Sequence, residues 1–257
     1  MDPKPITLYE WIIERFTVAG RAEFVEQLAT TFEQLVEPQA RVLDLCCGAG
    51  PFSFLFERLG AEVTGLDNAP FMIDLARQEA GRRGSSIEFV LADVLEHDLR
   101  SQHYDLVTFI GNTVSDFPLE AAVRLVEKTE TALRPGGRFV IHYIDGAYAF
   151  IEGSYPKEED EQLEPVKITR RFKTYRAEDS AIVETYRNES THEEYDYTSY
   201  LYTAPMVRRI VGARLALEQS IRLSERSFVD VFRNPAAPLR PVRQAARGTR
   251  PRDQANG

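Results

Sequence analysis

Three acidic residues stand in or after successive apolar segments, at a spacing that could bind a nucleoside. Asp44 opens the glycine-rich stretch Asp44-Leu45-Cys46-Cys47-Gly48-Ala49-Gly50. Asp67 ends the second segment, 19 residues after Gly48, and Asp93 follows the third. Glycine lets a backbone approach a ligand closely, and an acid at the end of the second strand binds ribose hydroxyls in nucleoside-binding folds. We therefore expect Asp67 to bind a ribose and Asp93 to receive an adenine amino group.

Each of these acids also has an ordinary structural explanation. Asp44 could cap local backbone, Asp67 could end a surface strand, and Asp93 could belong to a turn. Three acids at successive strand ends are harder to explain by three unrelated turns. Their combination therefore favours a binding site.

Apolar strands and amphipathic helices alternate along the first part of the chain. Strands are predicted at 41–45, 61–66, 87–92, 104–110 and 138–144. Helices are predicted at 8–16, 20–37, 51–59, 119–133 and from Asn68, as the N-terminal cap, to Gly81. Strands and helices that alternate in this way form an α/β fold with a doubly wound, mainly parallel sheet and right-handed crossovers.

The pattern changes after about residue 153. Segments 166–173, 181–188 and 195–202 alternate apolar and polar side chains, which is typical of an antiparallel three-stranded unit. We expect the acidic segment 157–164 to be a flexible, exposed connection. A short helix at 204–212 and strands at 214–223 and 227–232 follow. The predicted organisation is a main domain (1–152 and 203–233), an antiparallel β insertion (153–202) and a disordered basic tail (234–257).

Composition narrows the functional class. The 257 residues carry a net charge of −9, and 43% of them are hydrophobic. The tail holds five of the 31 basic residues, so the rest of the chain is more acidic still and suits neither DNA nor RNA. No apolar run suggests a membrane span or a secretory signal, and two adjacent cysteines make a structural disulfide implausible. We expect a soluble, cytoplasmic protein with no metal ion.

The strand-end residues resemble the motifs of class I S-adenosylmethionine (SAM)-dependent methyltransferases. The five similar segments, in order, are Val42–Gly50, Gly65–Asp67, Leu91–Asp93, Tyr104–Val107 and Leu133–Gly137. The resemblance covers about residues 41–145. It implies a seven-stranded Rossmann-like sheet in the order 3-2-1-4-5-7-6, with strand seven antiparallel and the β insertion acting as a lid after strand five.

The same resemblance implies SAM as the cofactor. Arg21 lies about twenty residues before the first motif, which matches the arginine that holds the SAM carboxylate in glycine N-methyltransferase. The residues expected to bind SAM are Arg21, Asp44, Cys46, Gly48, Gly50, Asp67, Asn68, Asp93, Val94 and Ile110.

Two other functions remain open at this point. An NAD(P)-type oxidoreductase would place a diphosphate on the glycine-rich turn and requires a third glycine where this chain has Ser53. Asp44 would also repel the diphosphate, whereas the cationic sulfonium of SAM tolerates acidic neighbours. A SAM-binding regulatory protein without catalysis is the second alternative.

The segment after the fourth strand bears on the acceptor. Ile110-Gly111-Asn112-Thr113 lacks the Asn/Asp-Pro-Pro-aromatic sequence usual in methyltransferases that modify DNA amino groups. It resembles small-molecule enzymes such as glycine N-methyltransferase and the aminosugar N-methyltransferases. The resemblance implies methyl transfer to a nitrogen or oxygen of a small molecule.

Few residues could contact such an acceptor. His142 and Tyr143 end the fifth strand with Asp145, Asp116 follows the fourth, and His192 lies in the insertion. We assign His142, Tyr143 and His192 as candidate catalytic residues, although a lone histidine is more often structural, and His97 and His103 even more so. The alternation of strand side chains puts Tyr195 and Tyr197 on one face, and Tyr200 and Tyr202 on the other.

The β insertion is expected to build the acceptor pocket over SAM, with its aromatic face and His192 against the acceptor. Such a lid would exclude water and large polymers. A dimerisation surface is the alternative, and a homodimer is left open.

Overall fold

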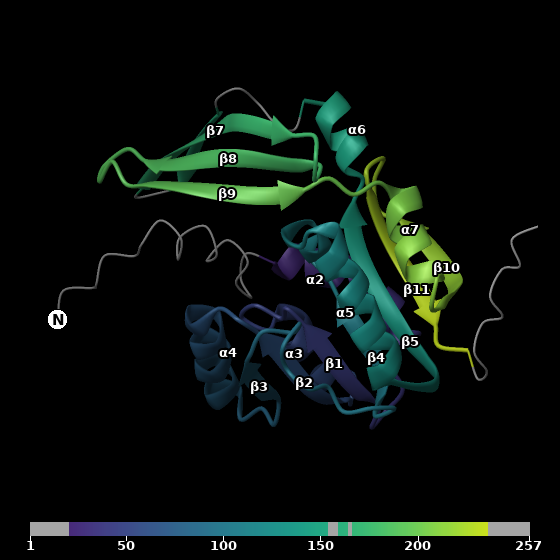
Figure 1. Ribbon diagram of the computed structural model, residues 1–257. Coiled ribbons are helices and arrows are strands. Elements are labelled where there is room, and N and C mark those ends of the chain that lie inside the picture. The colour runs from purple at the N-terminus through teal and green to yellow at the C-terminus, as the bar shows by residue number, and fades with distance from the viewer. Residues whose placement is uncertain (1–20, 154–158, 164–165, 236–257) are drawn as a thin grey trace, which may run out of the picture.

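The computed structural model describes residues 21–153, 159–163 and 166–235. Two separate β-sheets make up its framework (Figure 1). The helix expected at 8–16 and the expected tail from residue 236 onward lie outside the described residues. Within the described ranges, none of the helices is long and apolar enough to cross a membrane.

The larger sheet has seven strands in the order β3-β2-β1-β4-β5-β11-β10. In this sheet β11 is antiparallel to both of its neighbours, and the pairs among β1 to β5 are parallel. The predicted order 3-2-1-4-5-7-6 is therefore confirmed, with a Rossmann-like fold. The strands are β1 Arg41–Leu45, β2 Glu62–Asp67, β3 Glu88–Leu91, β4 Tyr104–Phe109, β5 Leu133–Ile144, β10 Ala216–Arg222 and β11 Ser227–Arg233.

Helices cover both faces of this sheet, which explains why its central strands are apolar throughout. Helices α2 (Ala22–Glu33), α3 (Pro51–Arg58) and α4 (Pro70–Arg83) contribute to one buried apolar cluster. Helices α5 (Leu119–Ala132) and α7 (Ala204–Gly212) contribute to the other. Strand β1 lies between them, and its Val42, Leu43 and Leu45 are all buried because both sides of the strand face apolar helices.

The expected cap of α4 was wrong by one residue. Ala69, not Asn68, holds the position before the helix, because the Asp67 carboxylate accepts the backbone N–H of Ala69 at 2.8 Å. Two short elements were not predicted. These are the 3-10 turn η1 (Thr113–Asp116) after β4 and helix α6 (Gly146–Ile151) after β5.

The second sheet is the insertion, and it has four antiparallel strands in the order β6-β7-β8-β9. They are β6 Glu159–Leu163, β7 Val166–Arg176, β8 Ala181–Asn188 and β9 Glu194–Tyr200. The expectation of a flexible connection at 157–164 was wrong for 159–163, because this backbone pairs with β7 as an edge strand. Figure 1 shows β7, β8 and β9 beside α6, beyond one end of the larger sheet, and β9 contacts η1.

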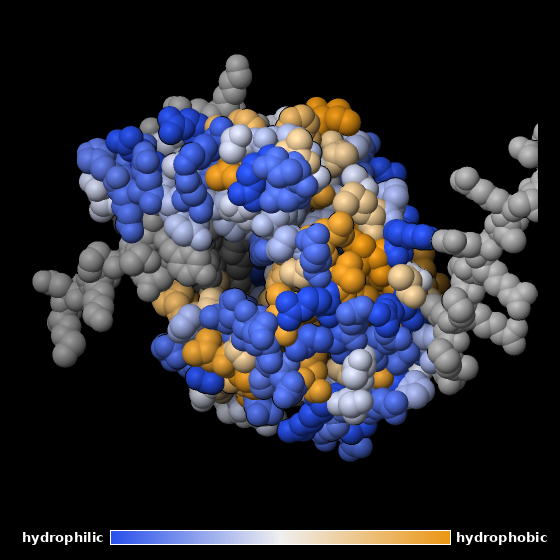
Figure 2. Space-filling model, in the orientation of Figure 1, coloured by the Kyte–Doolittle hydropathy of each residue, from blue (hydrophilic) through white to orange (hydrophobic). Residues whose placement is uncertain are grey.

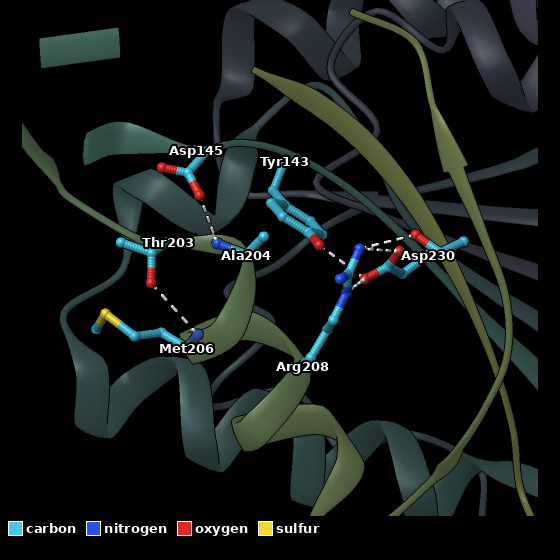
Figure 3. Close-up of polar contacts among 8 residues, drawn as sticks. Tyr143, Asp145, Thr203, Ala204, Met206, Arg208 and Asp230 are labelled. Atoms are coloured by element: carbon cyan, nitrogen blue, oxygen red, sulfur yellow. Dashed lines mark hydrogen bonds and ion pairs between the residues drawn. The ribbon is translucent and has the colours of Figure 1, made fainter. Parts of the chain in front are cut away.

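Asp145 bonds to the backbone at both places where the chain passes between the larger sheet and the insertion. Its Oδ1 accepts the N–H of Tyr148 and so caps α6, where the chain leaves the larger sheet. Its Oδ2 accepts the N–H of Ala204 at 2.9 Å, at the start of α7, where the chain returns (Figure 3). Asp145 is therefore a structural residue at the base of the insertion.

Tyr143 belongs to a buried network that joins β5, β11 and α7 (Figure 3). Its hydroxyl donates to Asp230 Oδ2 at 2.7 Å, and Arg208 Nε donates to the same oxygen at 2.8 Å. Asp230 has no exposed surface, so this charge needs its two donors. Burial, with the Asp230 carboxylate, raises the pKa of the Tyr143 phenol.

We predict that Tyr143→Phe lowers the free energy of unfolding by about 1–1.5 kcal/mol, because one buried hydrogen bond is lost while Arg208 still pairs with Asp230. Urea denaturation measures this loss. Tyr148→Phe, at an exposed hydroxyl that contacts Glu225, is the matched control and should change stability by less than about 0.5 kcal/mol. Calorimetry should show unchanged affinity for SAM, and a weakened affinity would contradict a purely structural role.

Candidate functional site

A cavity of about 710 Å³ lies where the carboxyl ends of β1, β2, β3 and β4 meet the insertion. Figure 2 shows a hollow in the surface between the insertion and the part of the molecule that contains the larger sheet. Nine of the ten residues expected to bind the cofactor line this cavity. They are Arg21, Asp44, Cys46, Gly48, Asp67, Asn68, Asp93, Val94 and Ile110.

Gly50 is the tenth residue, and it does not line the cavity, although its neighbour Pro51 does. It is the N-cap of α3 with φ +80°, and a Cβ atom there would lie 2.7 Å from Cζ of Phe89. Left-handed backbone and close packing require glycine at this position, and its contact with the cofactor stays a prediction.

The turn after β1 folds back onto the end of β2. Cys46 and Gly48 both have left-handed backbone, with φ +53° and +55°. The N–H of Cys47 donates to the Leu66 carbonyl, and the N–H of Gly48 donates to Asp67 Oδ2 at 2.8 Å. These bonds hold the turn after β1 against the end of β2. The turn and Asp67 therefore line the cavity side by side.

Asp67 keeps acceptor capacity after these bonds are made. Its two oxygens each take one backbone N–H, from Gly48 and from Ala69. An ionised carboxylate has about four acceptor sites, so roughly two remain for ribose hydroxyls. Burial raises the pKa of Asp67. Hydrogen bonds from ribose hydroxyls would favour the charged form of this carboxylate.

Asp44 is the most buried acid of the cavity wall. Its Oδ2 accepts the Ser53 hydroxyl at 2.6 Å, and its Oδ1 accepts the Thr108 hydroxyl at 2.9 Å. Burial raises the pKa of Asp44 to about 6. These contacts connect β1, α3 and β4, so Asp44 sets the shape of the turn more than it offers a free carboxylate.

Asp93 stands after β3 at the edge of the cavity. Its Oδ1 accepts the N–H of Leu95 at 2.8 Å, and its side chain is exposed. The neighbouring Val94 is buried and Ile110 lies across the cavity, so an apolar slot adjoins this carboxylate. An adenine ring with an amino group fits this combination.

The expected catalytic role of His142 is not supported by its position. The residue does not line the cavity, and both ring nitrogens are engaged. Nδ1 accepts the N–H groups of Gly111 and Asn112 at 3.2 and 3.1 Å, and Nε2 lies 2.9 Å from Ser227 Oγ. Burial lowers the pKa of His142 to about 3, with a smaller contribution from Arg21. His142 holds the backbone after β4 as a neutral group.

Tyr143 and His192 also lie outside the cavity wall. Tyr143 is enclosed in the network with Asp230 and Arg208, because its side chain points to the opposite face of β5 from His142. His192 is exposed in the β8–β9 hairpin, where its Nδ1 lies 3.3 Å from Arg187. The sequence placed all three near strand ends or in the insertion, but it did not reveal which way each side chain points.

The insertion supplies a different set of residues to the cavity, namely Arg170, Tyr186, Tyr195 and Tyr197. The expected common face of Tyr195 and Tyr197 agrees with the structure, whereas Tyr202 lies beyond the end of β9 and is not placed by strand alternation. Tyr195 and Tyr197 face the cavity, whereas Tyr202 is buried against the larger sheet and donates to the Phe117 carbonyl. Arg170 Nε lies 3.5 Å from Oε1 of the buried Glu184. Cross-strand pairing, which sequence alone did not assign, brings Arg170 and Tyr186 opposite one another.

Asp116 connects the part of the cavity wall formed by the larger sheet with the part formed by the insertion. It ends η1, lines the cavity, and accepts a hydrogen bond on Oδ1 from the Tyr197 hydroxyl. Burial raises the pKa of Asp116 to about 6. Its position after the fourth strand was a sequence signal, but its contact with an insertion tyrosine was not.

Comparison with known proteins agrees with this geometry. Residues 42–137 match the family model described as methyltransferase domain. The chain is 33% identical over 109 residues to a ribosomal protein L11 methyltransferase of Symbiobacterium thermophilum, covering 42% of this chain and 33% of that protein. It is 34% identical over 103 residues to a demethylmenaquinone methyltransferase of Thermus thermophilus, covering 39% and 46%.

A solved structure shares the fold over most of the chain. It is an S-adenosylmethionine-dependent methyltransferase from Clostridium acetobutylicum, with a TM-score of 0.68 and 12% identity, covering 88% of this chain and 98% of that one. Residues 42–137 therefore resemble a methyltransferase domain, and the chain shares the fold of a SAM-dependent methyltransferase. SAM is the expected cofactor. The chain spans less than half the length of the two sequence relatives named above.

The residues of the cavity fit SAM better than a dinucleotide. Position 53, where a dinucleotide site has its third glycine, is a serine whose hydroxyl bonds to Asp44. A diphosphate at this turn would meet Asp44 and Asp67, both in the cavity wall. SAM carries a sulfonium and an ammonium group and no phosphate, so the same acids attract it.

We predict that Asp44→Asn flattens the pH dependence of stability. A carboxyl whose pKa is raised to about 6 by folding binds its proton more tightly in the folded state. Its contribution is therefore greatest below the unfolded pKa of 3.8 and is lost as the pH rises through about 6. Between pH 4 and pH 7.5, wild type should lose up to roughly 3 kcal/mol more than the variant.

Urea denaturation of both proteins without SAM, at several pH values, measures this difference. Parallel curves for wild type and Asp44→Asn would show that this carboxyl does not titrate in that range.

Proposed function

We propose that this protein transfers the methyl group of SAM to a nitrogen or oxygen atom of a small molecule. The observation that carries the proposal is the single cavity with two unlike halves. One half is formed by acids at the strand ends of a methyltransferase fold, and the other by tyrosines of the insertion. Its volume of about 710 Å³ lies within the ~300–1,000 Å³ typical of small-molecule sites.

The cofactor half follows the polar groups of SAM. In this proposal Asp67 binds the ribose hydroxyls and Asp93 binds the adenine amino group. Arg21, just before α2, binds the carboxylate of the methionine part. Cys46, Gly48 and Asn68 form the backbone and side-chain wall between these charges.

The acceptor half is enclosed on its outer side by the insertion. Tyr186 and Tyr197 pack edge to face with ring centroids 6.4 Å apart, and Tyr195 lies opposite Tyr186 on the next strand. Aromatic walls on the side of the insertion favour an acceptor of limited size. The demethylmenaquinone relative is named for a small acceptor, whereas the L11 relative is named for a protein.

The finer resemblance to glycine and aminosugar N-methyltransferases belongs to this proposal. It rests on the position of Arg21, the Gly111-Asn112-Thr113 sequence and the antiparallel insertion after β5. Screening amines, hydroxy acids and phenols for formation of S-adenosylhomocysteine tests which class is methylated. Modification of a ribosomal protein with no reaction on any small molecule would contradict a small acceptor.

Catalysis in this arrangement depends mainly on positioning. When bound, SAM supplies a methyl carbon activated by its sulfonium. The acid-lined half holds the cofactor in one orientation, and the tyrosine-lined half holds the acceptor in line with the methyl group. The insertion excludes water from between them. A SAM-binding regulator without catalysis would bind SAM equally well but form no S-adenosylhomocysteine with any acceptor.

We predict that Asp67→Ala weakens SAM binding by roughly 1.5–3 kcal/mol for each ribose hydrogen bond lost. Titration calorimetry measures the affinity, and circular dichroism checks that the variant is folded. Asp98→Ala, at an exposed acid outside the cavity, is the control and should bind SAM as wild type does. Unchanged affinity in the Asp67 variant would remove the ribose assignment.

We predict that replacing residues 159–198 with a short Gly/Ser linker abolishes methyl transfer but preserves SAM binding. The replacement stops before Tyr200 and Tyr202, because Tyr202 is buried in the core of the larger sheet and Tyr200 packs against it. Calorimetry and an S-adenosylhomocysteine assay measure the two properties separately. A folded variant with full activity would show that the insertion does not form the acceptor site, and a changed oligomeric state would point to a dimerisation surface.

A further inference from the structure

Asp116 occupies the boundary between the cofactor loop and the insertion. Its side chain lines the cavity, and its charge acts on groups on both sides. Burial, and then neighbouring carboxylates that include Asp116, raise the pKa of Cys46 in the loop after β1. Burial and Asp116 raise the pKa of Tyr195 in β9. A carboxylate near both groups is close to where the methyl group and the acceptor must meet.

Asp116 is exposed at the cavity wall, and its hydrogen bonds differ from those of Asp44 and Asp67. Asp44 and Asp67 each have both oxygens engaged by donors of their own domain. Asp116 Oδ1 accepts the Tyr197 hydroxyl, and no donor from the described ranges bonds to its Oδ2. With respect to the described residues, one oxygen of Asp116 is therefore held by the insertion and the other is available to a ligand.

The histidines that the sequence suggested as catalytic residues do not line the cavity, so they cannot contact an acceptor there. His142 has both nitrogens bonded beneath the cavity, and His192 is exposed in a hairpin. Tyr143 is enclosed on the other face of β5. Asp116 does line the cavity, and its hydrogen bond with Tyr197 joins the larger sheet's side of the cavity to the insertion.

We infer that Asp116 accepts the proton of the methyl acceptor, and that Tyr197 positions its carboxylate for this step. The inference rests on the proposed function. The lone pair of the acceptor atom forms the new bond to the methyl carbon. The electron pair of the broken sulfur–carbon bond stays on sulfur, and the proton of the acceptor atom passes to Asp116 Oδ2 and later to water.

The surroundings of Asp116 suit this role near neutral pH. Asp67, at the end of β2, is the charged group that acts on Asp116, and Asp116 in turn acts on Cys46, Tyr195 and Tyr197. The other charged residues of the cavity wall are Arg21, Asp44, Asp93 and Arg170. Burial raises the pKa of Asp116 to about 6, while the Tyr197 hydrogen bond lowers it. Burial, with the Asp116 charge, also raises the pKa of Tyr197, so its hydroxyl stays protonated and donates. A base works best when its pKa is near the working pH.

The first test needs no known acceptor. Protein with isotope-labelled aspartate carboxyl carbons is titrated by NMR with saturating SAM or with S-adenosylhomocysteine, and Asp116→Asn and Asp44→Asn assign the two carboxyls that titrate near pH 6. We expect the Asp116 midpoint at lower pH with SAM, because only SAM places a positive sulfonium beside it. Equal midpoints with the two ligands would overturn the inference.

Tyr197→Phe separates positioning from mere packing in the same experiment. Loss of the donated hydrogen bond should move the Asp116 midpoint to higher pH, because that bond stabilises the charged form. A structural role for Tyr197 alone would leave the midpoint unchanged. Asp98→Asn, at an exposed acid outside the cavity, is the control and should not affect it.

The second test uses the acceptor identified by the screen. Asp116→Asn should lower kcat by about 10²-fold or more at saturating SAM. Calorimetry should show only the weaker SAM binding that follows from removing one negative charge beside the sulfonium. Tyr197→Phe should move the acidic limb of the kcat/KM profile to higher pH. Wild-type kcat in Asp116→Asn would overturn the inference and leave the proposed function intact. Failure of wild-type protein to bind SAM would instead remove the proposed function.

Discussion

The buried carboxylate of Asp44 is the constraint on which the cofactor site depends. A charged group with 3% of its surface exposed is costly unless donors surround it. Its donors are hydroxyls on two different elements, Ser53 on α3 and Thr108 on β4. The three elements must therefore keep one relative position. That position determines where the turn after β1 begins, and with it the left-handed backbone at Cys46 and Gly48.

A second carboxylate, Asp145, has the same importance for the insertion. It caps α6 as the chain leaves the larger sheet and bonds to the backbone at the start of α7 as the chain returns. The two crossings lie about 60 residues apart in sequence, so one side chain fixes the base of the insertion. With this base held, β9 can reach η1, and Tyr197 can contact Asp116.

The charges of the cavity explain both its ligand preference and its altered acidities. The acids Asp44, Asp67, Asp93 and Asp116 line it, together with Arg21 and Arg170. This excess of negative charge attracts a sulfonium and disfavours a diphosphate. The same burial that makes the site selective raises the pKa of Asp44 and of Asp116 to about 6. Binding and proton transfer thus depend on one electrostatic environment.

The sequence alone determined the fold class, the strand order through its family resemblance, and nine residues of the cavity wall. These features are local, because strand ends, glycine turns and acids follow one another within a few residues of chain. The direction of a side chain on β5, and the partners of a strand in the insertion, are not local. His142 and Tyr143 are adjacent in sequence, yet one bonds to backbone after β4 and the other to Asp230, because successive strand residues face opposite sides of a sheet.

The acceptor half was decided only by tertiary structure. Asp116 and Tyr197 are 81 residues apart, and no periodicity in the sequence relates them. Residues 159–163 form a strand in an acidic segment because β7 offers a free edge, not because their own pattern favours one. The need for glycine at position 50 also arises from a distant segment, because the ring of Phe89 in β3 packs against it. Contacts between distant segments depend on the register and packing of whole elements, and these exist only in the folded chain.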